Sequence, residues 1–385
     1  MRVCLVSLDY KPYRSSGLAT YAEDLARGLQ EGGLRVTVLA ARRPGLPRRH
    51  QVDEVEVYRA PIDGLDWISY AFRAARPLRN LERLDPFDVV HFLDVHFAYA
   101  YRGLYVASLW QSFRQRLTAH HGGPYHTGRE DYLRRQAYYR LARQAMEIPS
   151  LARAARLIAS CRATRAEFIA HYAIQPGAVD LAVQGIDTER FRPLPAAGLR
   201  RRLGLADKRV LLFVGFITPR KGLEYLAAAL RLLPPDVHLV VIGRWDPRYR
   251  VQVLQTLGPA RDRLHDLGYI ADADLPRYYA MADVYVAPSL LEGLGITPIE
   301  AMSCGTPAVV TSASSGPEEV GRDGLIVPPC DPPALAAALS RLLEDDALRR
   351  ELGRRGRQRV LRRFSYSRMA ALTLETYCRV QGSGD

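Results

Sequence analysis

The sequence predicts an α/β protein built from two Rossmann-like domains, each with a parallel sheet, that face each other across a cleft. At 385 residues the chain is too long for one ordinary core and fits two domains of about 150–200 residues. Strand and helix patterns alternate almost throughout, which is typical of parallel sheets with crossover helices. The alternation breaks once, near residues 190–207, where Phe191-Arg-Pro-Leu-Pro195 is typical of an extended linker.

The first domain is expected over residues 1–190. Its first long helix, Thr20–Glu31, carries apolar residues at helical spacing and ends in Gly32-Gly33, a good C-cap. A second helical region is expected from about Tyr132 to Ala155. The strands are expected at Arg2–Leu8, Val36–Ala40, Val55–Arg59, Val89–Phe92, Leu117–His120, Leu157–Ala159 and Val179–Val183.

After a linker over 191–207, the second domain is expected over residues 208–362. A final helix in 363–385 is expected to pack back on the first domain. The βα series of the second domain reads Val210–Gly215, Leu223–Leu233, Val237–Gly243, Val251–Leu257, Leu264–Tyr269, Leu275–Met281, Asp283–Ala287, a helix after residue 295, Ala308–Thr311, Leu325–Val327, and helices at about 333–344 and 346–362. Ligands of such sheets bind at the carboxyl ends of the strands.

Composition limits the class of protein. Hydrophobic residues make up 48% of the chain and charged residues 25%, which is globular, and no apolar run approaches the length of a membrane span. Because Met1–Leu8 already reads as a strand, we expect no signal peptide. The five cysteines are scattered without a C-x-x-C pair, which favours free thiols in a reducing cytoplasm and no metal site.

The net charge of +13 is spread evenly along the chain. A nucleic-acid-binding protein should gather its basic residues on one face, so we expect no nucleic-acid partner. The surplus would suit an anionic donor substrate, or anionic lipid beneath a peripheral enzyme. The Tyr- and Arg-rich residues 132–143 offer a membrane-docking alternative, although a solvated helix face is favoured.

The segment Pro288–Pro307 is the most informative part of the chain. Glu292 lies in a Gly-rich turn after a strand, and Glu300 lies eight residues later inside the following helix. The glycines let the backbone approach a ligand, and the helix directs its free N–H groups to the same place. A Glu can simply favour a helix dipole or face solvent, but the apolar residues flanking both carboxylates argue against that here. The arrangement suits a nucleotide-sugar.

This segment resembles the E-x7-E motif of retaining GT-B glycosyltransferases of family four, the group related to glycogen synthase and sucrose-phosphate synthase. The resemblance implies that Glu300 binds the ribose hydroxyls and that Glu292, near the transferred sugar, is catalytic. The backbone of Gly295, Ile296 and Thr297 would cradle phosphate or sugar hydroxyls. It also implies a nucleotide-diphosphate sugar as donor, most readily a UDP- or GDP-sugar, with no other cofactor and no divalent metal.

A cationic loop, Val214–Gly222, follows a buried strand and resembles the G-R-x-x-x-x-K-G loop of the same family. Lys221 matches and is expected to be catalytic, because a cation beside the leaving diphosphate stabilises its growing charge. Phe216 stands where the family has Arg, so Arg220 is the expected second cation in the donor site, together with Gly215. An ordinary solvated lysine is the alternative for Lys221.

Two loops of the first domain extend the resemblance. Tyr10–Leu18 resembles the glycine-rich loop at the donor phosphate, which implies donor contacts for Ser16 and Gly17 and an acceptor side with Tyr10 and Arg14. Thr118–Pro124 resembles the T-x-H-G segment: His121 is the expected catalytic histidine at the donor sugar, with His120 beside it on the acceptor side. His91 and His96, which flank Asp94, are interpreted as core or acceptor-side residues.

The nucleobase is expected near Gly243 and Tyr269, which lie in the segments where the family reads the base mostly with backbone groups. The predicted function is a retaining glycosyltransferase that moves a hexose-like sugar from a nucleotide diphosphate to an acceptor hydroxyl. The alternatives are a nucleotide-sugar-binding homologue with little turnover, or another enzyme of this fold such as a nucleotide-sugar epimerase. Both partners are small molecules, and the sequence does not predict the oligomeric state.

Overall fold

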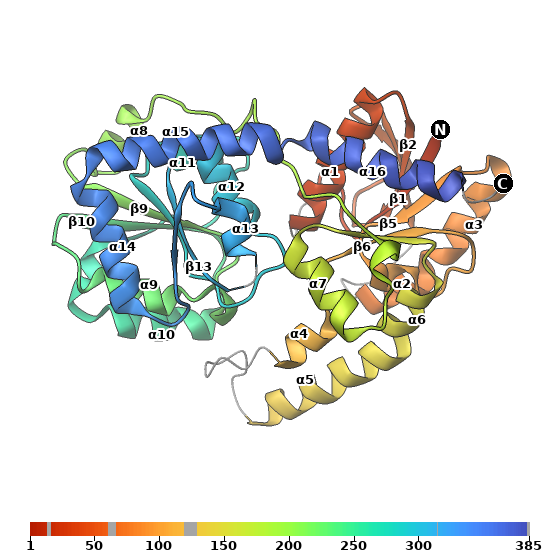
Figure 1. Ribbon diagram of the computed structural model, residues 1–385, viewed down its shortest axis with the longest axis horizontal. Coiled ribbons are helices and arrows are strands. Elements are labelled where there is room, and N and C mark those ends of the chain that lie inside the picture. The colour runs from red at the N-terminus through yellow and green to blue at the C-terminus, as the bar shows by residue number, and fades with distance from the viewer. Residues whose placement is uncertain (14–16, 61–66, 119–128, 314, 383–385) are drawn as a thin grey trace. The chain divides into compact units, whose positions relative to one another are not determined.

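The structure is a computed structural model that describes residues 1–13, 17–60, 67–118, 129–313 and 315–382 (Figure 1). The chain divides into two compact units. The first unit contains Met1–Thr118, Arg134–Gly185 and Ser365–Asp385, and the second is built mainly from Ile186–Phe364. Each unit is a parallel α/β domain with a hydrophobic core of its own. The prediction of two Rossmann-like parallel-sheet domains is therefore confirmed.

The first unit is built on an eight-stranded sheet in the order β3-β4-β2-β1-β5-β6-β7-β8. Within the described residues only β3 and β4 pair antiparallel. The strands are β1 (Arg2–Val6), β2 (Arg35–Ala41), β3 (Arg49–Val52), β4 (Val55–Ala60), β5 (Val89–Phe92), β6 (Val106–Leu109), β7 (Arg156–Ala159) and β8 (Val179–Leu181).

Helix α1 (Gly17–Glu31) covers this sheet with the apolar stripe that the sequence predicted, because Tyr21, Leu25 and Leu29 are all buried. The last helix, α16 (Tyr366–Gln381), packs beside α1 (Figure 1). Gly28 permits the close crossing, because a Cβ there would lie 2.6 Å from the Cβ of Ala370. The remaining helices of the unit are α2 (Trp67–Arg73), α3 (Ala75–Leu84), α4 (Phe113–Thr118), α5 (Arg129–Ala142), a π-helix (Arg143–Glu147), α6 (Ile148–Arg153) and α7 (Arg162–His171).

The second unit has a six-stranded parallel sheet in the order β11-β10-β9-β12-β13-β14. The chain runs outward from β9 through β10 to β11, then returns to the other side of β9 and runs outward from β12 to β14. The point where the order reverses therefore lies between β9 and β12, which is where doubly wound sheets bind ligands. The strands are β9 (Arg209–Val214), β10 (Val237–Ile242), β11 (Leu264–Asp266), β12 (Val284–Ala287), β13 (Ala308–Thr311) and β14 (Leu325–Val327).

Helices connect these strands and cover both faces of the sheet (Figure 1). Leu226, Leu230 and Leu339 from two of them are fully buried in its core, as the apolar spacing predicts. The helices are α8 (Ala197–Arg202), α9 (Leu223–Leu230), α10 (Pro247–Leu257), α11 (Leu275–Met281), α12 (Ile296–Ser303), α13 (Gly316–Val320), α14 (Pro332–Glu344) and α15 (Asp346–Arg363). Of the helices in the described ranges, none combines the length and apolar character needed to cross a membrane.

The strand predicted at Leu117–His120 is wrong over its described part, because residues 117 and 118 end helix α4. A capping box explains the helix: Gln115 N–H donates to Ser112 Oγ at 3.0 Å, and Ser112 N–H donates to Gln115 Oε1 at 3.2 Å. The strand of this region is instead β6, four residues that the sequence reasoning missed. The segment expected as an extended linker also contains a helix, α8.

Candidate active site

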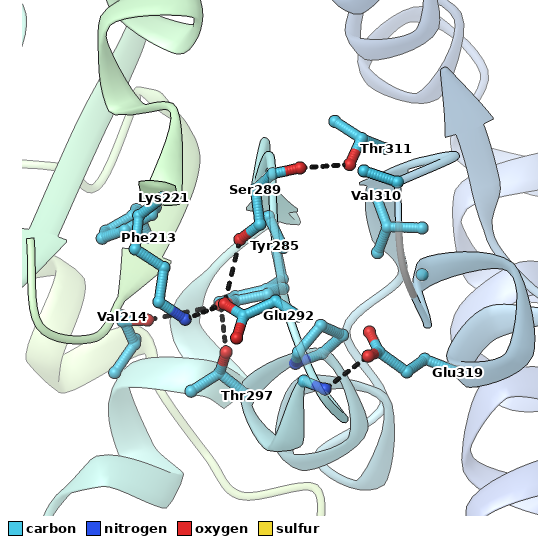
Figure 2. Close-up of a pocket in the computed structure, with 15 residues that line it drawn as sticks. Phe213, Val214, Lys221, Tyr285, Ser289, Glu292, Thr297, Val310, Thr311 and Glu319 are labelled. Carbon is cyan, nitrogen blue, oxygen red and sulfur yellow. Dashed lines mark hydrogen bonds and ion pairs between the residues drawn. The ribbon is translucent and has the colours of Figure 1, made fainter. Parts of the chain in front are cut away.

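A pocket lies in the second unit, at the carboxyl ends of β9 and β12 (Figure 2). This is the point where the strand order reverses. Four residues singled out from the sequence line it together: Lys221, Glu292, Gly295 and Thr297. The other lining residues are Phe213, Val214, Tyr285, Ala287, Ser289, Pro298, Val310, Thr311, Ala313, Gly316 and Glu319.

The loop after β9 carries the cations into the pocket. A short 3₁₀ turn, Pro219–Lys221, leads to Gly222, which has a left-handed backbone with φ of 65°. A Cβ on Gly222 would lie 2.1 Å from the carbonyl oxygen of Pro288, so a glycine is needed both for the turn and for this close approach. The contact brings Lys221 against the turn that follows β12.

Glu292 is held between the two cations of that loop. The Lys221 ammonium donates to Oε1, Arg220 Nη1 donates to Oε2 at 2.9 Å, and Ser289 Oγ donates to Oε1 at 3.2 Å. Burial alone would raise the pKa of Glu292, but Lys221 and Arg220 outweigh it and lower the pKa to about 2. Burial lowers the pKa of Lys221 in spite of its carboxylate partner. The two cations and the first glutamate thus form one partly buried ionic cluster.

Glu300 lies one turn into α12 and is not among the residues that line this pocket. Its side chain is buried against α11, where the Tyr279 hydroxyl donates to Oε2 at 2.6 Å. Burial raises the pKa of Glu300 to about 7, and the Tyr279 hydrogen bond offsets part of that rise. On the pocket side of the same helix, Tyr285 donates to Thr297 Oγ1 at 2.7 Å.

Glu319 on α13 is a site residue that the sequence reasoning missed. Its carboxylate accepts the N–H of Gly295, just before α12 begins, and the hydroxyl of Ser315 at 2.6 Å. A Cβ on Gly295 would lie 2.7 Å from Glu319 Oε1, so this contact requires glycine at 295. The sequence signal was weak, because an acidic residue in the first turn of a helix usually only complements the helix dipole.

The edge expected for the nucleobase is formed by β9, β10 and the segment after β11. A Cβ on Gly243 would lie 1.8 Å from the Gly215 carbonyl oxygen, and Gly243 N–H donates to Gly268 O at 2.7 Å. Tyr269 is 62% exposed, and the Arg244 guanidinium lies 5.4 Å from its ring centroid. An exposed aromatic ring beside tightly packed backbone suits a stacked base.

Several site residues predicted for the first domain, namely Arg14, Ser16, His120 and His121, lie outside the described residues. Gly17 begins α1. Tyr10 is buried in the core with 3% of its surface exposed, so its ring offers little surface to an acceptor here.

His91 and His96, the histidines that flank Asp94, are both buried. His91 lies between Tyr377 and Ser108 at 2.7 and 2.8 Å, and burial lowers its pKa to about 3. Burial opposes protonation of His96, but Asp94 and Glu147 raise its pKa to about 9. Within the ranges that the structure describes, no group of three or more His, Cys, Asp or Glu side chains could hold a metal ion.

Comparison with known proteins matches both halves of the chain to glycosyltransferase families. Residues 15–190 match the model of Glycosyltransferase Family 4, and residues 198–359 match that of Glycosyl transferases group 1. An uncharacterized glycosyltransferase of Methanocaldococcus jannaschii is 28% identical, over 98% of each chain. A D-inositol 3-phosphate glycosyltransferase of Salinispora tropica is 36% identical over 61% of this chain, which spans about half (53%) of that relative.

Solved structures share the fold. Sucrose-phosphate synthase from Thermosynechococcus elongatus superimposes with a TM-score of 0.81 at 24% identity, over 99% of each chain. Anabaena HepE in complex with UDP-glucose gives a TM-score of 0.74 at 20% identity, over 98% of this chain and all of that one. These likenesses show the GT-B fold. The two family matches, which together span most of the chain, show that it belongs to the group 1, family 4 glycosyltransferases and is a transferase.

Proposed function

We propose that this enzyme transfers a hexose-like sugar from a nucleotide diphosphate to an acceptor hydroxyl, with retention of the anomeric configuration. The observation that carries the proposal is the cluster of Lys221, Arg220 and Glu292 near the N-terminus of helix α12. Cations and helix N–H groups recognise phosphate, while a carboxylate recognises sugar hydroxyls. HepE, which shares the fold, has been crystallised with UDP-glucose.

The donor would bind along the carboxyl edge of the second sheet. Its diphosphate replaces Glu292 as the partner of Lys221 and Arg220. It also accepts hydrogen bonds from the N–H groups of Ile296 and Thr297. The N–H of Gly295 already donates to Glu319, and this hydrogen bond fixes the turn. The phosphates are therefore bound by the N–H groups of Ile296 and Thr297.

In this proposal Glu300 and Tyr269 bind the nucleoside. The ribose hydroxyls donate to the carboxylate of Glu300, and the base stacks on the exposed ring of Tyr269 beside Gly243. The family resemblance also implies that His121 contacts the transferred sugar and that the acceptor binds beside it.

The chemistry follows from these positions. The bond from the anomeric carbon to the diphosphate breaks and its electron pair leaves with the diphosphate. Lys221 and Arg220 stabilise that growing charge. The acceptor hydroxyl attacks from the same face and gives its proton to the leaving phosphate oxygen, so no side chain bonds to the sugar. Glu292, released from Lys221, accepts hydrogen bonds from the sugar hydroxyls. Because side-chain cations and helix N–H groups serve the phosphates, the proposal requires no divalent metal.

A second candidate is a nucleotide-sugar-binding protein with little turnover. The observation that favours it is Phe216, which is 57% exposed and occupies the position of the Arg in the related cationic loop. Without Arg220 acting in place of that residue, the leaving diphosphate would have one cation instead of two.

A thermal-shift screen over UDP-, GDP-, ADP- and TDP-sugars, followed by product analysis, tests the proposal. The proposal expects at least one donor to raise the melting temperature, and the coupling constant of the anomeric proton in the product to show the donor's configuration. Binding without transfer or hydrolysis, over a broad acceptor panel, would instead support the binding protein. An inverted product would contradict the retaining mechanism.

A further inference from the structure

Glu319 is a buried carboxylate that the mechanism above does not use, although it lines the donor pocket. Figure 2 shows Glu319 and Lys221 on opposite sides of Glu292. Only 2% of the Glu319 side chain is exposed. The carboxylate accepts hydrogen bonds from Gly295 N–H and Ser315 Oγ, and both end on Oε1. Among the residues that the structure describes, none donates a hydrogen bond to Oε2.

The groups around Glu319 do not neutralise it. The cations Lys221 and Arg220 are both paired with Glu292. Arg359 on α15 donates to the backbone oxygen of Glu319 and not to its carboxylate. Burial, helped by the charge on Glu292, therefore outweighs the lowering by Ser315, Gly295 and Lys221, and the pKa of Glu319 is raised to about 7. Among the described residues, Tyr285 also interacts electrostatically with Glu319, and Glu318 precedes Glu319 on α13.

A diphosphate changes this balance. When all four groups are ionised, Lys221 and Arg220 are balanced by Glu292 and Glu319. A nucleotide-sugar adds a negative charge on each phosphate and draws the two cations toward itself. Lys221 then stabilises the Glu319 carboxylate less, while new negative charge lies in the same low-dielectric pocket. An ionised Glu319 would oppose donor binding.

We propose that the carboxylate of Glu319 takes up one proton from solvent when the donor binds. The inference rests on the proposed function, since it requires a diphosphate in the pocket. A protonated Glu319 keeps its structural contact, because the carbonyl oxygen still accepts the N–H of Gly295. Its new O–H turns an acceptor-only group into a hydrogen-bond donor toward the ligand. Glu319 is thus a positioning residue for helix α12 and the proton-linked group of the donor site.

Isothermal titration calorimetry measures this directly. The probe is UDP-, GDP-, ADP- or TDP-glucose, whichever gives the largest thermal shift, because these diphosphate diesters have no phosphate that titrates near neutrality. Titrations at about pH 8 in buffers of different ionisation enthalpy, at one ionic strength, give the number of protons taken up. We expect the wild type to take up close to one proton per bound probe, and much less at about pH 6, where Glu319 is already protonated.

Two variants separate Glu319 from other sources of protons. Glu319→Gln keeps an oxygen for Gly295 but cannot titrate, so it should bind the probe with little or no proton uptake. Glu318→Gln removes the same charge from the same helix without lining the pocket, and should behave like the wild type. If the Glu319→Gln variant takes up as many protons as the wild type, Lys221 or another group is responsible and the inference is wrong.

A third variant tests the inference even if Glu319→Gln does not fold. Ser315→Ala removes the hydroxyl that lowers the pKa of Glu319, so the pH at which uptake begins should move upward. An unchanged pH profile in Ser315→Ala would contradict the inference. If none of the four probes binds the wild type, the proposed function fails and this inference fails with it. Binding without proton uptake overturns the inference alone.

Discussion

Lys221 and Glu292, 71 residues apart in the sequence, form a partly buried ion pair in which the lysine ammonium donates to Oε1 of the glutamate. The pair joins the cationic loop after β9 to the Gly-rich turn after β12. It keeps a cation inside the protein, where an unpaired charge would be costly. An incoming diphosphate can displace the carboxylate from the lysine, and the proton uptake proposed for Glu319 offsets the negative charge that the diphosphate adds.

Lys221→Ala should therefore lower the transfer rate by about two to three orders of magnitude, since removing one charge-stabilising donor in other enzymes costs that much. The measurement is the initial rate of product formation at saturating donor. Lys208→Ala, on a partly exposed lysine that pairs with Asp207, is the matched control and should leave the rate unchanged. Equal rates in the two variants would exclude Lys221 from the reaction.

Arg220 is expected to supply the second cation of the donor site, because Phe216 stands where related loops have an arginine. Arg220→Ala should raise the donor KM about tenfold or more, the usual cost of losing a charge-assisted hydrogen bond. Adding Phe216→Arg to Arg220→Ala should recover part of the loss, because it returns a cation to the position that related loops use. If Arg220→Ala leaves the donor KM unaffected, the second cation must come from elsewhere.

Glu292 should contribute acid-sensitive stability. Its pKa is lowered from 4.5 in the unfolded chain to about 2 in the folded protein, which corresponds to about 3 kcal/mol. Because the folded pKa is depressed, this stabilisation is present above pH 4.5 and is lost as the pH falls toward 2. Urea unfolding of Glu292→Gln should show a smaller loss of stability across that window than the wild type. Parallel pH profiles would show that the ion pair contributes nothing.

Glu300 should make nucleotide affinity depend on pH. Burial raises its pKa to about 7, so it becomes a poorer acceptor for ribose hydroxyls as the pH falls through that value. Tyr279→Phe removes a hydrogen bond to the carboxylate form, which moves the pKa higher and should weaken nucleotide binding several-fold at neutral pH. The dissociation constant is best measured against pH in the Glu319→Gln background, where the second buried carboxyl cannot titrate. A profile that Tyr279→Phe does not shift would separate Glu300 from the nucleotide.

The regular parts of the fold were predictable because their signals are local. Helix α11 and strands β13 and β14 begin and end where the apolar patterns indicate, since each is bounded by turn residues or follows a short loop. The strand β6 (Val106–Leu109) was missed although it is as long as β13, because Ser108 interrupts its apolar run. Ser108 is buried by tertiary hydrogen bonds with Tyr21 and His91, which no local pattern encodes. The helix α4 was misread as a strand because a capping box, not hydrophobic spacing, determines where it begins.

In the site, too, residues in local patterns were predictable and residues placed by tertiary contacts were not. Lys221 and Glu292 were predictable from a resemblance, since both lie in loops with a recognisable residue pattern. The role of Glu319 was not, because it depends on a tertiary contact with Gly295, which lies 24 residues earlier. The pairing of Arg220 with Glu292 likewise depends on Gly222 passing close to Pro288, a packing fact that no local pattern encodes.

The most direct test of the central claim is a crystal structure of the enzyme with its donor nucleotide-sugar. The account predicts diphosphate oxygens within about 3 Å of Lys221 Nζ and of the N–H groups of Ile296 and Thr297, with Glu292 turned from the lysine to the sugar. A diphosphate bound elsewhere, with the pair of Lys221 and Glu292 still closed, would contradict it.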